Sequence, residues 1–235
     1  ARIVDGTGAP WYRADIAVEG GKIAAIGKLS GEARETVDAA DHYLAPGFID
    51  IHSHSDDSIL ACPAAESRIL QGVTTEIAGN CGASAGPAPE GKKDGWPGMG
   101  AFLSAVEAAA PSVNLGMLVA HGAVRACAMG YGSEKPTPAQ LQRMRALIAE
   151  AMEAGAFGIS SGLIYPPSSY ADTEELIEVA KAVAPYGGYY ATHMRGEGRT
   201  VVKATEEAIR IAREARVPLQ VSHHKVTYKP DWQVS

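Results

Sequence analysis

Six short apolar runs, spread between residues 48 and 221, constrain the fold of this chain most strongly. They lie at 48–51, 75–78, 115–119, 157–160, 189–192 and 218–221, and amphipathic segments separate the later ones. Strands that alternate with helices indicate parallel β/α units. Two α/β architectures are compatible with this pattern, an open doubly wound sheet and a closed (β/α)8 TIM barrel.

Three segments between the later runs are predicted to be helices. In the first, Thr137-Pro138 is typical of a helix start and Gly155 of its end. Asp172-Thr173 caps the second, which Gly187-Gly188 ends, and the third spans residues 199–216. Each has an apolar face. These faces consist of Leu141, Met144, Leu147, Ile148, Ala151 and Met152 in the first helix, Leu176, Val179, Ala180 and Val183 in the second, and Val202, Thr205, Ile209 and Ala212 in the third.

The end of the first run favours the barrel. A nucleotide-binding sheet places a glycine fingerprint after its first strand, whereas this run ends in His52-Ser53-His54. Residues 47–235 hold only six of the eight strands of a barrel. We therefore expect the first six β/α units of a metal-dependent hydrolase barrel here, and a polypeptide that continues beyond Ser235.

Residues 1–46 follow a different pattern. Short runs such as 2–6, 15–19 and 22–26 alternate apolar with polar or small residues, and Gly20-Gly21 separates two of them. This is typical of hairpins with one solvated face. Fewer than fifty residues bury little core by themselves. The segment is predicted to begin a small β-sandwich domain, and a β extension of one larger domain remains the alternative.

Composition limits the function. The chain of 235 residues has a net charge of −6 and no basic cluster, which argues against binding to nucleic acid or to an anionic membrane surface. No apolar stretch reaches the roughly 18 residues of a membrane span. Three cysteines are too few for a secreted disulfide framework, so we expect a cytoplasmic location.

Potential metal ligands follow four of the six runs. Because the carboxyl ends of parallel barrel strands open on one face, these side chains are expected to converge there. They are His52, His54, Cys81, His193, His223 and His224. Residues i and i+2 of a strand point to the same side, so His52 and His54 can reach one ion. Imidazole and thiolate together favour zinc. Buried core histidines and an inert thiol at Cys81 are the structural alternatives.

Other histidines and cysteines lack this context. Cys62 and Cys127 are expected to be inert thiols, and His42 to lie on the surface. His121 follows the third run and either lines the pocket or is a hydrogen-bonded histidine with no chemical role.

The motifs at the strand ends resemble those of the amidohydrolase superfamily, and within it the N-acyl-D-amino-acid deacylases (D-aminoacylases). The likeness extends over the whole chain. It includes Pro46-Gly47-Phe48-Ile49-Asp50-Ile51-His52-Ser53-His54, Gly79-Asn80-Cys81-Gly82, Thr192-His193-Met194-Arg195-Gly196-Glu197 and Ser222-His223-His224-Lys225. The opening His-x-His is shared across the superfamily, while the cysteine and the His-His-Lys segment are more specific.

This resemblance implies a ligand set. Cys81, His193 and His223 would hold one zinc tightly, and His52 and His54 would form a second, weaker or optional position that shares Cys81. The similar hydantoinases and dihydroorotases use a carboxylated lysine on strand four, but segment 157–165 contains no lysine. The general base implied by the family is an aspartate after strand eight, which is expected beyond Ser235.

Further residues acquire predicted roles from the same resemblance. Lys225 would bind the carboxylate of the substrate, with a solvated loop lysine as the alternative. Tyr165 would lie near the substrate, with ordinary packing under a loop as the alternative. We expect Arg195 to pair with Glu197. Asp56 and Asp57 would orient the histidines of the first strand or cap a helix. Residues 83–100 form either a lid or a disordered surface loop.

The prediction from the sequence is zinc-dependent hydrolysis of small-molecule N-acyl-D-amino acids to a carboxylate and a free D-amino acid. A cyclic-amide hydrolase and a non-catalytic barrel are the alternatives. The acyl group, the preferred side chain and the oligomeric state stay open.

Overall fold

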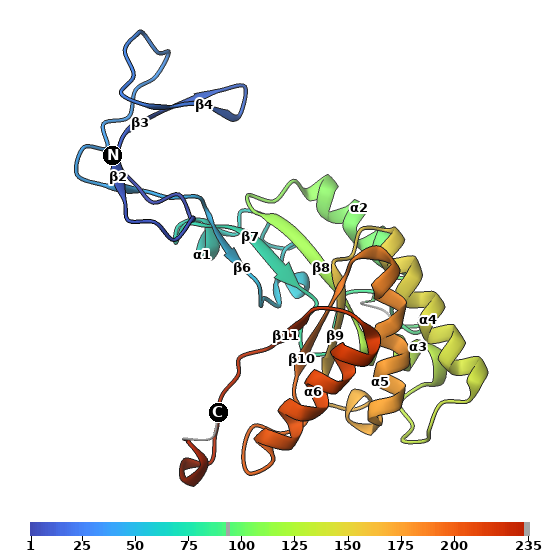
Figure 1. Ribbon diagram of the computed structural model, residues 1–235. Helices are drawn as coiled ribbons and strands as arrows, with labels where there is room; N and C mark the ends of the chain where they lie inside the picture. Colours follow the sequence, from blue (N-terminus) through green and yellow to red (C-terminus); the bar gives the residue numbers. More distant parts are fainter. Residues whose placement is uncertain (93–94, 233–235) are drawn as a thin grey trace. The chain divides into compact units, whose positions relative to one another are not determined.

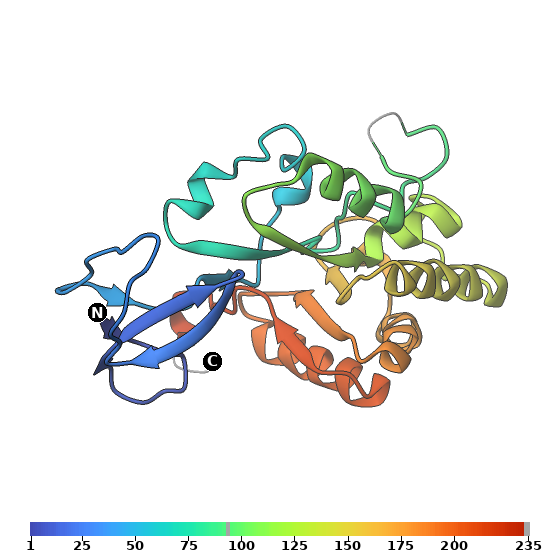
Figure 2. The same ribbon diagram turned by 90° about the horizontal axis from the view of Figure 1, so that it is seen from above.

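A computed structural model describes residues 1–92 and 95–232 of the chain. It divides into two compact units, Ala1–Phe48 and Ile49–Ser235. The first unit contains a three-stranded sheet in the order β2-β1-β5 and a separate hairpin of β3 and β4, seen in blue in Figure 2. Their bounds are Arg2–Ile3 for β1, Tyr12–Arg13 for β2, Asp15–Glu19 for β3, Lys22–Gly27 for β4 and Tyr43–Leu44 for β5.

The hairpin predicted around Gly20-Gly21 is confirmed, because β3 and β4 pair antiparallel on either side of these residues. The β-sandwich is not shown, since the unit has only these two small sheets within its described residues. Ile3 is buried, while Val18 and Ile23 of the hairpin are exposed. His42 is exposed, as the sequence predicted.

The larger unit is built on a six-stranded sheet whose order follows the sequence, β6-β7-β8-β9-β10-β11 (Figure 1). The strands from β7 to β11 run parallel. Their bounds are Phe48–Asp50 for β6, Val73–Ala78 for β7, Asn114–Ala120 for β8, Gly158–Gly162 for β9, Tyr189–His193 for β10 and Leu219–Val221 for β11. All six predicted strands are confirmed, in the order of the first strands of a β/α barrel.

Helices connect these strands and lie along one side of them (Figure 1). They are α1 (Glu66–Ile69), α2 (Met99–Ala109), α3 (His121–Met129), α4 (Pro138–Glu153), α5 (Thr173–Ala180) and α6 (Val201–Ala215). Short 3-10 turns lie at Ser55–Asp57 (η1), Ser168–Tyr170 (η2), Lys181–Tyr186 (η3) and Lys229–Asp231 (η4). The sequence analysis did not predict α2 and α3. In the described part of the chain, no helix combines the length and the apolar character that a bilayer span requires.

The predicted starts of α4 and α5 are confirmed. Thr137 and Gln140 form a reciprocal capping box at α4, and the Asp172 side chain accepts a hydrogen bond from the Glu175 amide at α5. The predicted apolar faces of both helices are buried or half-buried in the main core.

The face predicted for α6 is confirmed at the buried Ala212 and the half-buried Thr205 but wrong at Val202 and Ile209. Val202 and Ile209 are exposed, and the buried side is formed by Val201, Ala204, Ala208, Ile211, Ala212 and Ala215. Alanines allow a helix to approach the sheet closely, so the small residues face inward while two larger aliphatic residues remain outside.

The described part of segment 83–100, which was predicted to be a lid or a disordered surface loop, makes hydrogen bonds and packing contacts of its own. Trp96 exchanges backbone hydrogen bonds with Ala85 and Ala88, and its ring packs at 5.9 Å from that of Phe102. Residues 93 and 94 lie outside the described residues. The segment is therefore anchored to α2 by its own aromatic side chain.

Candidate metal centre

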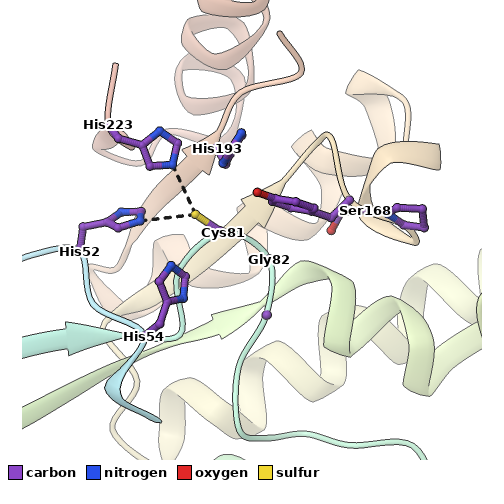
Figure 3. A pocket seen from close by; sticks show the side chains of 10 residues that line it. His52, His54, Cys81, Gly82, Ser168, His193 and His223 are labelled. Atoms are coloured by element: carbon purple, nitrogen blue, oxygen red, sulfur yellow. Dashed lines mark hydrogen bonds between the residues drawn. The ribbon is translucent and has the colours of Figure 1, made fainter. Parts of the chain in front are cut away.

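Five predicted ligands converge at the carboxyl ends of the strands. They form two overlapping groups, His52, His54 and Cys81 in one and Cys81, His193 and His223 in the other. Within each group the potential ligand atoms lie within 4.8 Å of one another. The Cys81 thiol lies 3.4 Å from His52 Nε2 and 3.5 Å from His223 Nε2, so it stands between the groups (Figure 3). The sixth candidate, His224, belongs to neither group.

The backbone around Cys81 explains the surrounding glycines. Gly79 and Gly82 have φ angles of +76° and +77°. A Cβ atom on Gly79 would lie 2.1 Å from the Leu118 carbonyl oxygen, and one on Gly82 would lie 2.5 Å from the Gly162 nitrogen. Only glycine allows this backbone to pass so close to β8 and β9. The glycines thus bring the thiol to the mouth of the sheet.

Two ligand residues themselves adopt left-handed backbone conformations. Cys81 has a φ of +54° and His223 a φ of +38°, both uncommon for residues with a Cβ atom. Such conformations cost free energy and concentrate at functional sites. Their presence at two of the five side chains supports a functional reading of the cluster.

The donor set fits a zinc ion. Both ring nitrogens of His193 are buried without a hydrogen-bond partner among the described residues. A buried polar atom without a partner costs about 1–3 kcal/mol, and a metal on Nε2 would remove that cost. One thiolate with two imidazoles is a ligand set that zinc accepts. These residues would hold the ion, as the sequence analysis proposed from the resemblance.

The pKa shifts describe the site without metal. Burial, followed by the charge of Glu197, raises the pKa of the Cys81 thiol to about 11. Burial lowers the pKa of His193, and burial together with the neighbouring His223 lowers that of His52. The last two imidazoles are therefore biased toward the neutral form that binds metals.

A pocket of about 410 Å³ opens beside the cluster. All five proposed ligands line it, together with Gly82, Ala83, Tyr165, Pro166 and Ser168. The Tyr165 ring lies edge-on to His193, 5.2 Å between centroids. Tyr165 therefore lies beside the proposed ligands, and its place near a substrate stays a prediction. Lys225 is not among the lining residues and lies beside His223, with its Nζ 3.2 Å from Nδ1.

The predicted pair of Arg195 and Glu197 is wrong. Arg195 instead forms a bidentate ion pair with Glu207 of α6 and donates to the carbonyl groups of Ser169 and Ala171. Glu197 accepts a hydrogen bond from Lys225 and lies 3.0 Å from His223 Nδ1. Burial alone would raise the pKa of Glu197, but the Lys225 hydrogen bond and the nearby charged groups lower it. These contacts of Glu197 were not predicted from the sequence, although Glu197 lies four residues beyond His193.

The predicted histidine-orienting role of Asp56 is also wrong. The buried Asp56 carboxylate accepts from the backbone amides of Ala85 and Gly79, at 2.9 and 3.4 Å. It therefore holds the loop that carries Cys81, and Asp57 is exposed. Burial and the neighbouring Asp57 raise the pKa of Asp56.

Of the two alternatives for His121, a pocket-lining residue or a hydrogen-bonded histidine, the structure shows the second. It is fully buried, its Nδ1 lies 2.8 Å from the Ser168 hydroxyl, and its Nε2 lies 3.1 Å from Glu175. Glu175 also accepts from the buried Arg125. No sequence signal marked Ser168, which joins this buried network to the pocket. Cys62 is exposed and Cys127 half-buried, and neither belongs to a metal-binding group among the described residues.

Comparison with known proteins agrees with this geometry. The Amidohydrolase family profile matches residues 35–232. A D-aminoacylase of Alcaligenes xylosoxydans xylosoxydans is 43% identical over 243 residues, which cover 98% of this chain and 50% of that protein. The chain thus spans about half the length of the curated relatives it matches.

Solved structures show the same likeness. A D-aminoacylase crystal structure, described as defining a novel subset of amidohydrolases, superposes with a TM-score of 0.93 at 42% identity, covering 98% of this chain and 52% of that one. An N-acyl-D-glutamate deacylase of Bordetella bronchiseptica, complexed with zinc and a phosphonate mimic of the tetrahedral intermediate, gives 0.92 at 39% identity, covering 96% and 50%.

Fold and site together define a β/α protein with a cluster of potential metal ligands at the carboxyl ends of its parallel strands. The chain belongs to the Amidohydrolase family. Among its members it is similar to the D-aminoacylases and to deacylases of N-acyl-D-glutamate and N-acyl-D-aspartate.

Proposed function

We propose that the protein carrying this chain hydrolyses the amide bond of N-acyl-D-amino acids with the help of zinc. The observation that carries the proposal is the convergence of Cys81, His193 and His223 beside a pocket of substrate size. The names of its relatives, D-aminoacylase and N-acyl-D-glutamate deacylase, support the same substrate class.

Cys81, His193 and His223 are the proposed ligands of the tightly bound zinc, and His52 and His54 extend the site to a second position around the shared thiolate. When bound, zinc supplies a Lewis acid that polarises a carbonyl group and makes water more acidic. Burial lowers the pKa of His52 and of His193, which favours the neutral imidazole that binds a metal.

Lys225 and Tyr165 are the proposed substrate-binding residues. The Lys225 ammonium lies next to His223 and is about half exposed, so it can pair with the α-carboxylate of a substrate at the metal. Tyr165 forms part of the pocket wall beside His193.

The finer features of the fold follow the same proposal. Residues 47–235 form the first six β/α units of a TIM barrel, and residues 1–46 begin a small β-sandwich domain. The enzyme acts on small-molecule substrates in the cytoplasm. The absence of a lysine in segment 157–165 disfavours the cyclic-amide alternative, and the filled ligand positions disfavour a non-catalytic barrel.

The test measures zinc content and the hydrolysis of N-acetyl-D-methionine, its L enantiomer and the N-acetyl derivatives of D-glutamate and D-aspartate. We expect bound zinc and turnover of at least one D substrate over the L enantiomer. Turnover of hydantoins with none of N-acyl-D-amino acids would favour the cyclic-amide reading. A well-folded protein without zinc would contradict both.

A further inference from the structure

A single carboxylate connects a proposed metal ligand to the proposed substrate-binding lysine. Glu197 Oε1 lies 3.0 Å from His223 Nδ1 and accepts a hydrogen bond from Lys225 Nζ. The same oxygen lies 3.8 Å from His193 Nε2. The Glu197 side chain is only 15% exposed, so the carboxylate is largely withdrawn from water. Its contacts therefore act in surroundings where charges interact strongly.

The chemistry of the His223 ring identifies what Glu197 does there. The Nε2 atom of His223 faces the Cys81 thiol (Figure 3), so this nitrogen is the one available to a metal. A neutral imidazole that binds metal through Nε2 carries its proton on Nδ1. Two groups lie within hydrogen-bonding distance of Nδ1, Lys225 Nζ at 3.2 Å and Glu197 Oε1 at 3.0 Å.

Only one of these two groups can accept the Nδ1 proton. A lysine ammonium has three donors and no acceptor, whereas a carboxylate oxygen is an acceptor. In the tautomer that binds metal through Nε2, His223 Nδ1 therefore cannot form a hydrogen bond with the Lys225 ammonium. It can donate one to the Glu197 carboxylate. The ammonium in turn balances the charge of the carboxylate from the other side.

The backbone of Glu197 is fixed independently of its side chain. The Glu197 carbonyl oxygen accepts from the Thr227 amide at 2.7 Å and from the Thr227 hydroxyl at 3.0 Å. These bonds join the loop after β10 to the loop after β11, which carries His223 and Lys225. A substitution of the side chain at position 197 leaves them in place, so it can be tested without disconnecting the loops.

We propose that Glu197 is a positioning residue that accepts the Nδ1 proton of His223, which directs Nε2 to the metal, and that holds the Lys225 ammonium next to the same ligand. This inference rests on the proposed function. Through one carboxylate, the enzyme couples the orientation of a metal ligand to the placement of the cation for the substrate carboxylate. Carboxylates that orient metal-bound histidines commonly contribute 10- to 100-fold to metal affinity or activity.

The experiment compares Glu197→Gln and Glu197→Ala with wild type by zinc competition against a chromophoric chelator. We expect Glu197→Ala to weaken zinc binding about 10- to 100-fold. Glu197→Gln keeps an acceptor oxygen but loses the charge, so its zinc affinity should lie between those of wild type and Glu197→Ala. Wild-type affinity in Glu197→Leu, which keeps a side chain of similar volume but has no acceptor, would show that packing alone matters and would overturn the proposal.

Two further readouts separate positioning from general loosening. In zinc-loaded wild type the ring nitrogens of His223 should show, by ¹⁵N NMR, a protonated Nδ1 protected from exchange, and Glu197→Ala should lose the protection. KM for N-acetyl-D-methionine should rise more in Glu197→Ala than kcat falls, because Lys225 loses its restraint. Glu207→Gln is the matched control, since it releases Arg195 in the same loop without touching His223, and it should keep wild-type zinc affinity.

The possible failures are distinguishable. A wild-type protein that binds no zinc overturns the proposed function and this inference with it. Wild-type zinc affinity and deacylase activity that persist unchanged in Glu197→Ala overturn this inference alone. A loss of zinc affinity in Glu207→Gln equal to that in Glu197→Ala would assign the effect to the loop as a whole and would also overturn it.

Discussion

Replacing Gly82 with alanine tests the claim that the backbone next to Cys81 is built around the absence of a side chain. Gly82 has a φ of +77°, and a Cβ atom there would lie 2.5 Å from the Gly162 nitrogen and 3.1 Å from the Ser168 hydroxyl. The Gly162 nitrogen belongs to the backbone of β9, and the buried Ser168 hydroxyl forms a hydrogen bond with His121. Neither neighbour can yield easily, so the loop that carries Cys81 must move.

The cost has two parts. A left-handed backbone conformation costs a residue with a Cβ atom about 1–2 kcal/mol, and overpacking in a closely packed region costs about 1–3 kcal/mol. Gly82→Ala should therefore destabilise the protein by about 2–5 kcal/mol. Gly187→Ala is the matched control, because Gly187 has a φ of +70° and a Cβ atom there would meet nothing within 4 Å. Gly187→Ala should therefore lose stability only through the cost of the left-handed backbone conformation.

The free energy of unfolding of both variants is measured by urea titration in chelator, and zinc affinity by competition. Gly82→Ala should be less stable than Gly187→Ala by about 1–3 kcal/mol and should bind zinc more weakly, because Cys81 is displaced. Equal stability of the two variants, or unchanged zinc affinity in Gly82→Ala, would refute the close-approach reasoning.

Three further predictions concern the ligands and the buried network. Burial and then the charge of Glu197 raise the pKa of the Cys81 thiol to about 11, so zinc must displace a proton when it binds. The dissociation constant of zinc should therefore fall about tenfold for each unit of increase in pH between about pH 7 and 9. A dissociation constant that does not change with pH, measured by chelator competition, would contradict this. Cys81→Ala should abolish zinc binding at both positions, because Cys81 belongs to both ligand groups. His54 belongs to only one group, so His54→Ala should retain one zinc in elemental analysis. One zinc retained by Cys81→Ala would contradict this prediction. Glu175→Gln leaves the fully buried Arg125 without its counter-charge. It should lower the free energy of unfolding, measured in urea, by about 3–5 kcal/mol. A decrease below about 1 kcal/mol would show that the carbonyl partners of Arg125 are enough to stabilise its buried charge.

The strands and three of the helices could be predicted from the sequence because their signals are local. The capping residue Thr137, the proline after it and the spacing of apolar residues all lie within one segment, and local spacing determines which residues share a face. The face of α6 was mispredicted in part because Val202 and Ile209 lie at the edge of its apolar side rather than at the centre. The side that packs depends on close approach to the sheet, which favours Ala204 and Ala208 over the bulkier Val202 and Ile209.

The candidate ligands were also visible, since each follows a strand and parallel strands bring their ends together. Their partners were not. Glu197 pairs with Lys225, 28 residues further along the chain, and Arg195 pairs with a residue of α6 rather than with its near neighbour. Such choices depend on which loops lie side by side in three dimensions, and no periodicity in the sequence records them.

The left-handed backbone at His223 implies a conflict between stability and metal binding. Its φ of +38° places a non-glycine residue where a conformational cost of about 1–3 kcal/mol is usual. His223→Gly removes this cost, while the greater chain entropy of glycine offsets about 0.5–1 kcal/mol of the gain. We expect the variant to equal or exceed wild type in urea stability when a chelator is present. Zinc at about 100 times its dissociation constant should stabilise wild type by about 2.7 kcal/mol and leave the variant almost unchanged. The order of stability should therefore reverse when zinc is added, because the conformation that strains the chain also directs the imidazole to the metal. A variant that is clearly less stable than wild type in chelator would show that the backbone at His223 is not strained.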